Sequence, residues 1–155
     1  MKEKKFHDGS RYEGDLVDNK RNGKGIYYYK NGDIYMGDWL HDKFHGKGIY
    51  IFAKGDRYEG ELKNGMKHGR GTYYYSNGNQ YDGDWENDKK HGRGTYTYLL
   101  TGEKYSGDWE RGLKSGKGVF TFSYGDYYDG GFANGVKEGY GVINFKSGAV
   151  FNGNW

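Results

Sequence analysis

Three histidines recur at a fixed spacing and are the first candidates for metal chemistry. His45, His68 and His91 lie 23 residues apart. If they occupy equivalent places in neighbouring hairpins, they are two strands, or about 9.5 Å, apart. Zinc-bound nitrogens lie only about 2.0–2.1 Å from the metal. We therefore interpret these histidines as structural residues near turns and predict neither a metal site nor a cofactor.

The carboxylates do not form a catalytic constellation. Pairs such as Asp108 and Glu110 occupy repeated positions that we expect to be solvated, and no unique His, Ser or Cys arrangement accompanies them as a nucleophile. The repeated Gly-x-Gly motifs also lack the Gly-x-x-x-x-Gly-Lys-(Ser/Thr) sequence of a phosphate-binding loop. The sequence predicts a protein that is not an enzyme.

A basic residue stands in the middle of five Gly-x-Gly motifs, and such a series could bind anionic lipid or nucleic acid. This basic series is Lys24, Lys47, Arg70, Arg93 and Lys117. An acidic series precedes it by nine positions: Asp15, Asp38, Glu61, Asp84 and Asp108. We predict cross-strand pairs within each repeat, which would cancel most of the field. With a net charge of only +3, we expect no nucleic-acid partner and keep a peripheral membrane adaptor as the alternative function.

These residues recur because the whole chain repeats every 23 residues, with one step of 24. Each repeat begins with an aromatic-x-Gly motif and carries Gly-x-Gly eleven residues later. Repeat proteins bury their apolar surface between neighbouring repeats. We predict a single array over residues 1–155, with repeats starting near Tyr12, Tyr35, Tyr58, Tyr81, Tyr105 and Tyr128 and a C-terminal stub at Phe151.

Each repeat contains two β patterns, such as residues 12–16 and 23–29. We predict antiparallel pairing of Tyr12 with Tyr27, Gly14 with Gly25 and Leu16 with Gly23. A glycine three residues before each aromatic predicts the return turn, and the extra residue in 99–102 should lengthen that turn without shifting the register. The loop inside each repeat should have a positive φ at Asn19, Asp42, Gly65, Asp88, Gly112 and Gly135.

The pattern Tyr-x-Gly-x-(Trp or Leu), followed by (His, Asn or Ser)-Gly-(Lys or Arg)-Gly, resembles the MORN (membrane occupation and recognition nexus) repeat over essentially the whole chain. The best matches are residues 35–39 with 45–48 and residues 81–85 with 91–94. The chain departs from the pattern at Leu16, Leu62 and Phe132, and at Gly131, Glu138 and Tyr140 in the sixth repeat.

The resemblance implies an all-β fold, an elongated and twisted single-layer antiparallel sheet of β-hairpins, used as a scaffold in cilia, the cytoskeleton and membrane junctions. Residues 97–105 are also similar to the corresponding stretch of radial spoke head proteins of ciliary axonemes. The chain has no cysteine and no signal peptide, which favours a cytoplasmic location. We expect a cytoskeletal or axonemal assembly, with self-association through the repeat ends as a further expectation.

Aromatic residues make up 19% of the chain, and a single-layer sheet has no second layer to cover them. Aromatic rings in a groove are good anchors for a partner helix or an extended peptide. We predict a protein partner on this aromatic stripe and a non-enzymatic scaffold function. The predicted contact residues are Trp39, Tyr50, Tyr73, Tyr75, Trp85, Tyr96, Tyr98 and Trp109.

Overall fold

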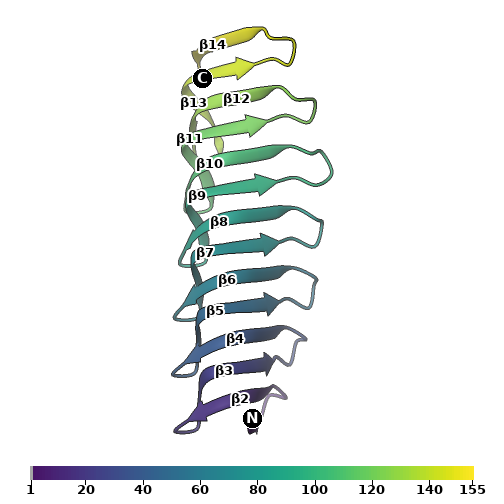
Figure 1. The fold of residues 1–155 in the computed structure, drawn as a ribbon, viewed down its shortest axis with the longest axis vertical. Helices are drawn as coiled ribbons and strands as arrows, with labels where there is room; N and C mark the ends of the chain where they lie inside the picture. The colour runs from purple at the N-terminus through teal and green to yellow at the C-terminus, as the bar shows by residue number, and fades with distance from the viewer. Residues whose placement is uncertain (1) are drawn as a thin grey trace. The chain divides into compact units, whose positions relative to one another are not determined.

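The computed structural model describes residues 2–155, which form fourteen β-strands and no helix (Figure 1). None of these residues therefore belongs to a helix that could cross a membrane. The strands are β1 (Lys2–Lys5), β2 (Arg11–Val17), β3 (Lys20–Tyr28), β4 (Ile34–Leu40), β5 (Lys43–Ile51), β6 (Arg57–Lys63), β7 (Met66–Tyr74), β8 (Gln80–Glu86), β9 (Lys89–Thr97), β10 (Lys104–Glu110), β11 (Leu113–Thr121), β12 (Tyr127–Ala133), β13 (Val136–Asn144) and β14 (Val150–Asn154).

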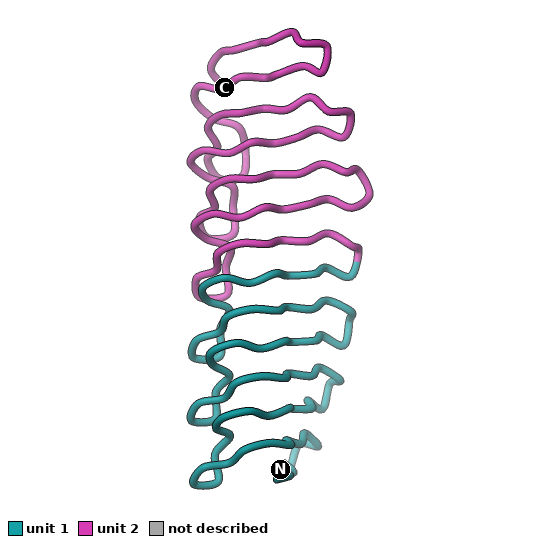
Figure 2. The backbone as a smooth tube through the Cα atoms, viewed as in Figure 1, with its two compact units in different colours: residues 1–76 teal, residues 77–155 magenta. Residues whose placement is uncertain are grey.

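The strands belong to two compact units, residues 1–76 with β1 to β7 and residues 77–155 with β8 to β14 (Figure 2). Within each unit, every strand pairs antiparallel with its neighbours in the sequence. The predicted all-β, single-layer fold of tandem hairpins is confirmed. A single array over residues 1–155 stays a prediction.

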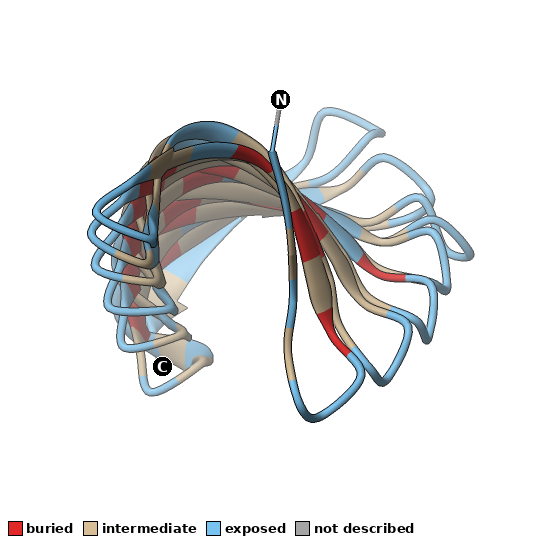
Figure 3. Cartoon of the chain, turned by 90° about the horizontal axis from the view of Figure 1, so that it is seen from below, coloured by how far each residue is buried: buried red, intermediate tan, exposed pale blue. Residues whose placement is uncertain are grey.

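The strand register agrees with the prediction in its first half only. Tyr12 lies opposite Tyr27 and Gly14 opposite Gly25, as expected, but Leu16 lies opposite Arg21 and not opposite Gly23. The register shifts between Gly14 and Leu16 because β3 carries two more residues there than β2. Such bulges bend a strand sharply, and Figure 3 shows strongly bent strands with exposed turns at both ends.

The turns follow the predicted chemistry. The residues expected to have positive φ all do, for example Asn19 at 61° and Gly135 at 87°. The residue before each is also left-handed, as at Asp18 with φ 51°, so the loops have the two positive φ angles of a type I′ hairpin turn. In the return turn with the extra residue, the Gly102 N–H donates to Tyr98 O at 2.9 Å, and the register beyond it is intact.

The core of each unit is a row of tyrosines lying flat over glycines. The first aromatic of every full repeat is 0–1% exposed, and its hydroxyl donates to the carbonyl oxygen three residues later at 2.7–3.0 Å. A Cβ on Gly25 would lie 2.1 Å from the Tyr12 Oη, so only glycine leaves room for the ring. The core tyrosines are Tyr12, Tyr35, Tyr58, Tyr81, Tyr105 and Tyr128.

Candidate partner-binding face

One side of the sheet, called here the aromatic face, carries the core tyrosines and a second series of rings beside them. In the first unit these rings contact one another in sequence across β3, β5 and β7, with centroids 4.5–5.9 Å apart. Distances in this range are favourable for aromatic pairs. The connected rings are Tyr27, Tyr29, Tyr50, Phe52, Tyr73 and Tyr75.

The second unit has an equivalent series of connected rings on β9 and β11 and in the turn that follows. Its centroids are 4.7–6.3 Å apart, and it ends at Tyr124, which is 63% exposed. The rings are Tyr96, Tyr98, Phe120, Phe122 and Tyr124. Both units therefore present a connected aromatic surface that is partly open to solvent.

The predicted contact residues all lie on this face but differ in exposure. The indoles of Trp39, Trp85 and Trp109 are 4–6% exposed and Tyr73 is 9% exposed. Each of these rings is held by ring contacts or hydrogen bonds, as when Trp109 Nε1 donates to Gly94 O at 3.0 Å. The buried rings therefore support the surface from beneath. The partly exposed predicted residues are Tyr50, Tyr75, Tyr96 and Tyr98.

A series of polar side chains fixes the rim of the aromatic face, and the sequence analysis missed it. The Tyr73 hydroxyl donates to Asp56 Oδ2 at 2.6 Å, while Asp56 Oδ1 accepts the Ser76 N–H at 2.8 Å. Burial opposes ionisation of Asp56, but these donors and Lys54 hold its pKa below the usual value. Burial, together with the Asp56 carboxylate, raises the pKa of Tyr73. The phenol therefore stays neutral and in place at physiological pH.

A row of cations on the aromatic face was also missed. Nine residues after the first aromatic, five of the six repeats carry a Lys or Arg whose charged group lies 4.7–5.9 Å from ring centroids. Counting back by twos from Tyr27 in β3 places Arg21 on the same face, so strand alternation could have revealed the row. Its members are Arg21, Lys67, Lys90, Lys114 and Lys137.

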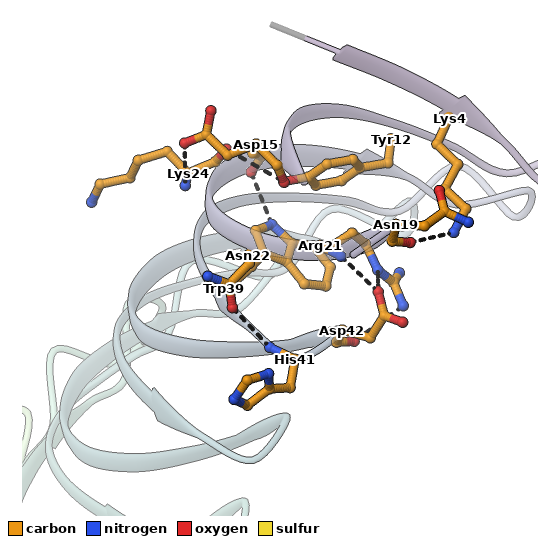
Figure 4. Close-up of polar contacts among 11 residues, drawn as sticks. Lys4, Tyr12, Asp15, Asn19, Arg21, Asn22, Lys24, Trp39, His41 and Asp42 are labelled. Atoms are coloured by element: carbon orange, nitrogen blue, oxygen red, sulfur yellow. Dashed lines mark hydrogen bonds and ion pairs between the residues drawn. The ribbon is translucent and has the colours of Figure 1, made fainter. Parts of the chain in front are cut away.

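Figure 4 shows how this arrangement begins in the first unit. The Arg21 Nε donates to Asp42 Oδ1 at 2.9 Å, and the guanidinium carbon lies 4.7 Å from the Trp39 ring centroid. The rings of Tyr12 and Trp39 lie inside the bend of the strands, whereas the Lys24 side chain points away from it (Figure 4). The two basic series therefore occupy opposite faces of the sheet.

On the opposite face, called here the charged face, the predicted pairing within each repeat is wrong. Lys24 lies in register with Asp38 of the next repeat, and its Nζ forms an ion pair with that carboxylate. Arg93 pairs in the same way with Asp108, with Nη1 and Oδ1 2.8 Å apart. The acid of the same repeat instead accepts a backbone N–H, as when Asp15 accepts from Lys24 at 3.2 Å.

Asp38 and Asp108 therefore each join two repeats, since one carboxylate oxygen accepts a backbone N–H of its own repeat and the other meets the base of the preceding repeat. The reason is the bulge, which turns the carboxylate of the acidic residue toward the backbone of its own hairpin and leaves its second oxygen for the base of the preceding repeat. Burial opposes ionisation of Asp38, but the Lys24 side chain and the Lys47 N–H hold the pKa of that carboxyl below its usual value. Among residues 2–155, no group of three or more His, Cys, Asp or Glu side chains is placed to hold a metal ion.

A protein-family model for the MORN repeat matches the chain at residues 12–34, 35–57, 58–80, 81–98, 105–127 and 128–150. These segments cover most of the chain. The chain belongs to the MORN repeat family. The aromatic face and the paired charges are thus the two faces of a MORN sheet.

The sixth MORN repeat differs from the other five in lacking the acid, and, like the first and third repeats, it has no Trp at the position of Trp109. Lys117 lies in register with Gly131, where the earlier repeats have an acid. Phe132 occupies the position of Trp109 and has no ring N–H to donate. Within the second unit, the contact between the last two repeats therefore lacks both the ion pair and the indole hydrogen bond that join the fourth repeat to the fifth.

Two solved structures share this MORN-like fold. The TCP domain of Drosophila melanogaster SAS-4 (dCPAP), in complex with a proline-rich motif of Ana2 (dSTIL), has a TM-score of 0.57 and 14% identity, covering 99% of this chain and 89% of that one. The TCP10c domain of Drosophila melanogaster Sas-4 has a TM-score of 0.55 and 12% identity, covering 97% and 90%. A search of curated protein sequences found no significant match.

Proposed function

We propose that this MORN protein is a non-enzymatic scaffold that binds an extended segment of a partner protein on its aromatic face. The observation that carries the proposal is the connected, partly exposed series of rings in each unit. These rings are held in place by the buried tryptophans and by the polar rim, so little ordering entropy remains to be lost on binding. The Tyr50 hydroxyl, for example, donates to Asp33 Oδ2 at 2.8 Å.

The type of partner follows from the shape of this surface. A connected series of rings suits a segment that carries its own pre-formed shape, and proline-rich segments dock on aromatic surfaces at low entropic cost. The TCP domain of similar fold is described in complex with a proline-rich motif, which supports the same class of partner here. We therefore propose a proline-rich segment in preference to a helix.

The charged face offers less to an anionic membrane. Two of its bases pair with acids of the next repeat, Lys24 with Asp38 and Arg93 with Asp108, which reduces the net field at physiological salt. The scaffold is accordingly proposed ahead of the membrane adaptor. The similarity of residues 97–105 to radial spoke head proteins supports our proposal of a cytoplasmic location in a cytoskeletal or ciliary assembly.

Replacing Tyr75 by alanine should weaken binding of the partner by at least about 1–2 kcal/mol, because a partly exposed ring held by Tyr73 is a suitable anchor. Tyr74→Ala is the matched control. Tyr74 is the preceding residue and is similarly exposed, but it packs under Arg57 on the charged face. Calorimetry would measure how tightly a partner isolated with the full chain binds to the parent and to both variants. Each variant must first show an unchanged melting transition. Loss of binding in Tyr74→Ala alone would place the interface on the charged face.

A further inference from the structure

In the second unit Lys114 lies beside Gly135, whereas the equivalent base of the first unit, Arg21, lies beside the carboxylate of Asp42. In the first unit, the Asp42 N–H donates to Arg21 O at 3.0 Å, and the Asp42 side chain neutralises Arg21. In the second unit, the Gly135 N–H donates to Lys114 O at the same distance of 3.0 Å. Gly135 thus occupies the place of Asp42 without its side chain, and the acid is missing.

Lys114 and Lys137 both lie partly buried over rings. The Lys114 Nζ is 5.4 Å from the Phe120 ring centroid and donates a hydrogen bond to the Tyr98 hydroxyl at 3.3 Å. The Lys137 Nζ is 5.4 Å from the Phe122 ring centroid. In the part of the chain that the structure describes, these two ammonium groups contact ring faces and have no ion pair.

The two lysines line one hollow of about 430 Å³ on the aromatic face of the second unit. Its walls are aromatic and aliphatic, and Glu103 is the single acid among its lining residues. Partial burial lowers the pKa of Lys114, since water solvates its ammonium incompletely. A carboxylate entering the hollow would meet two partly buried cations set among rings. The other lining residues used here are Phe120, Phe122, Phe132 and Trp155.

We propose that the occupant of this hollow is an acidic, proline-rich segment of a partner protein, with carboxylates three residues apart that meet Lys114 and Lys137. The inference rests on the proposed scaffold function and specifies the chemistry of the partner. The prolines lie against the rings, and the carboxylates supply the charge that Asp42 supplies to Arg21 in the first unit. The segment runs across the strands, from β11 to β13.

The three-residue spacing follows from the geometry of the sheet. Lys114 and Lys137 begin at equivalent places two strands apart, a separation of about 9.6 Å at about 4.8 Å per strand. A polyproline II helix advances about 3.1 Å per residue and has three residues per turn, so residues i and i+3 point the same way about 9.3 Å apart. A β-strand places residues i and i+3 on opposite faces. Of these two extended forms, only the proline-rich one presents carboxylates three residues apart to the same face.

The first experiment compares three blocked peptides by calorimetry with the full chain at low ionic strength. The test peptide is Pro-Pro-Glu-Pro-Pro-Glu-Pro-Pro. One comparison peptide has the same composition with adjacent glutamates, Pro-Pro-Glu-Glu-Pro-Pro-Pro-Pro, and the other has glutamine in place of both glutamates. We expect the glutamine peptide to bind about tenfold more weakly, and the peptide with adjacent glutamates to bind about threefold more weakly because it reaches only one lysine well.

The second experiment restores the missing acid. Gly135→Asp should place a carboxylate beside Lys114 as Asp42 does beside Arg21, and should weaken the test peptide about tenfold by internal competition. Gly135→Asn is the matched control, because asparagine keeps the side-chain shape without the charge and tolerates the left-handed backbone of φ 87°. An added Cβ meets only Leu113 Cδ2, at 3.8 Å, so both variants should fold. The Gly135→Asn variant should bind the test peptide with an affinity within about twofold of that of the unsubstituted chain.

Three results would overturn the inference. Equal binding of the glutamate and glutamine peptides, both weakened by Tyr98→Ala, would keep the scaffold function and remove the acidic partner. Equal effects of Gly135→Asp and Gly135→Asn would show that shape, not charge, controls access to the hollow. Binding to phosphatidylserine vesicles, without binding to any peptide, would assign the lysines to a lipid surface. Loss of partner binding in Tyr75→Ala is measured separately from these peptide experiments. The proposed scaffold function can therefore fail or stand independently of the acidic partner.

Discussion

Gly107→Ala is expected to destabilise the second unit by about 3 kcal/mol or more, because the new methyl group has no room. An added Cβ would lie 2.5 Å from the Gly118 Cα and 2.5 Å from the Lys117 carbonyl oxygen. Both are backbone atoms of the paired strand β11, so relief requires the two strands to separate. Tyr105 closes the remaining space, with its Oη 2.8 Å away.

The matched control for this substitution is Gly153→Ala. Gly153 occupies the same place in the aromatic-x-Gly motif of β14, but an added Cβ there meets only Phe151 ring carbons at 3.7 and 3.9 Å. Chemical denaturation of both variants measures the free energy of unfolding. We expect a change within about 0.5 kcal/mol for Gly153→Ala, as for substitutions that create no clash. Similar decreases in the free energy of unfolding of Gly107→Ala and Gly153→Ala would show that β propensity, not the close approach of strands, sets the need for glycine.

Stability should also fall steeply between about pH 10 and pH 12. Burial raises the pKa of Tyr105 to about 12, whereas an unfolded tyrosine titrates near 10. Above pH 10 the unfolded chain therefore binds fewer protons than the folded chain, and the free energy of unfolding decreases as pH rises. At full effect Tyr105 alone accounts for a loss of about 3 kcal/mol. Burial also raises the pKa of Tyr29 to about 12 and that of Tyr35 further.

This loss is measured by following tyrosinate absorbance and β-sheet circular dichroism together during an alkaline titration. The part of the absorbance change that comes from the core phenols should coincide with the loss of the sheet signal, because these phenols ionise only as the sheet unfolds. Tyr105→Phe is the control: it removes the hydrogen bond to Asp108 O and so lowers stability at neutral pH, but it should flatten the decline above pH 10. Ionisation of all tyrosines near pH 10 with the sheet intact would contradict the prediction.

The repeat and its turns could be predicted from the sequence because they depend on local rules. Tyr12 and Gly14 alternate as strand residues do, and positions such as Asn19 carry residues that tolerate a left-handed backbone. The bulge could not be predicted in the same way. Pairing Leu16 with Gly23 or with Arg21 keeps Leu16 on the same face, so the hydrophobic pattern does not distinguish the two registers.

The sequence pattern also could not predict which acid pairs with each base. A base in a sheet has an acid available on both neighbouring strands, and only the register on each side decides between Asp15 and Asp38 as the partner of Lys24. The candidate site was predicted as a stripe of rings; these rings lie on one face, and their role in binding a partner stays a prediction. Exposure was not predictable, because the burial of Trp39 depends partly on contacts with Tyr12 and Tyr27 of the preceding repeat.

The glycine at position 131 has a consequence for the order in which the second unit opens. In a repeat protein, stability is divided between the repeats and the contacts that join them, and the weakest contact sets where unfolding begins. With Gly131 and Phe132 at the joining positions, the last hairpins are held to the rest of the unit by fewer bonds than the fourth and fifth repeats are to each other. Local unfolding is therefore expected to have a direction: β12 to β14 should detach as one cooperative segment, and amide hydrogens there should exchange before those of β9 to β11.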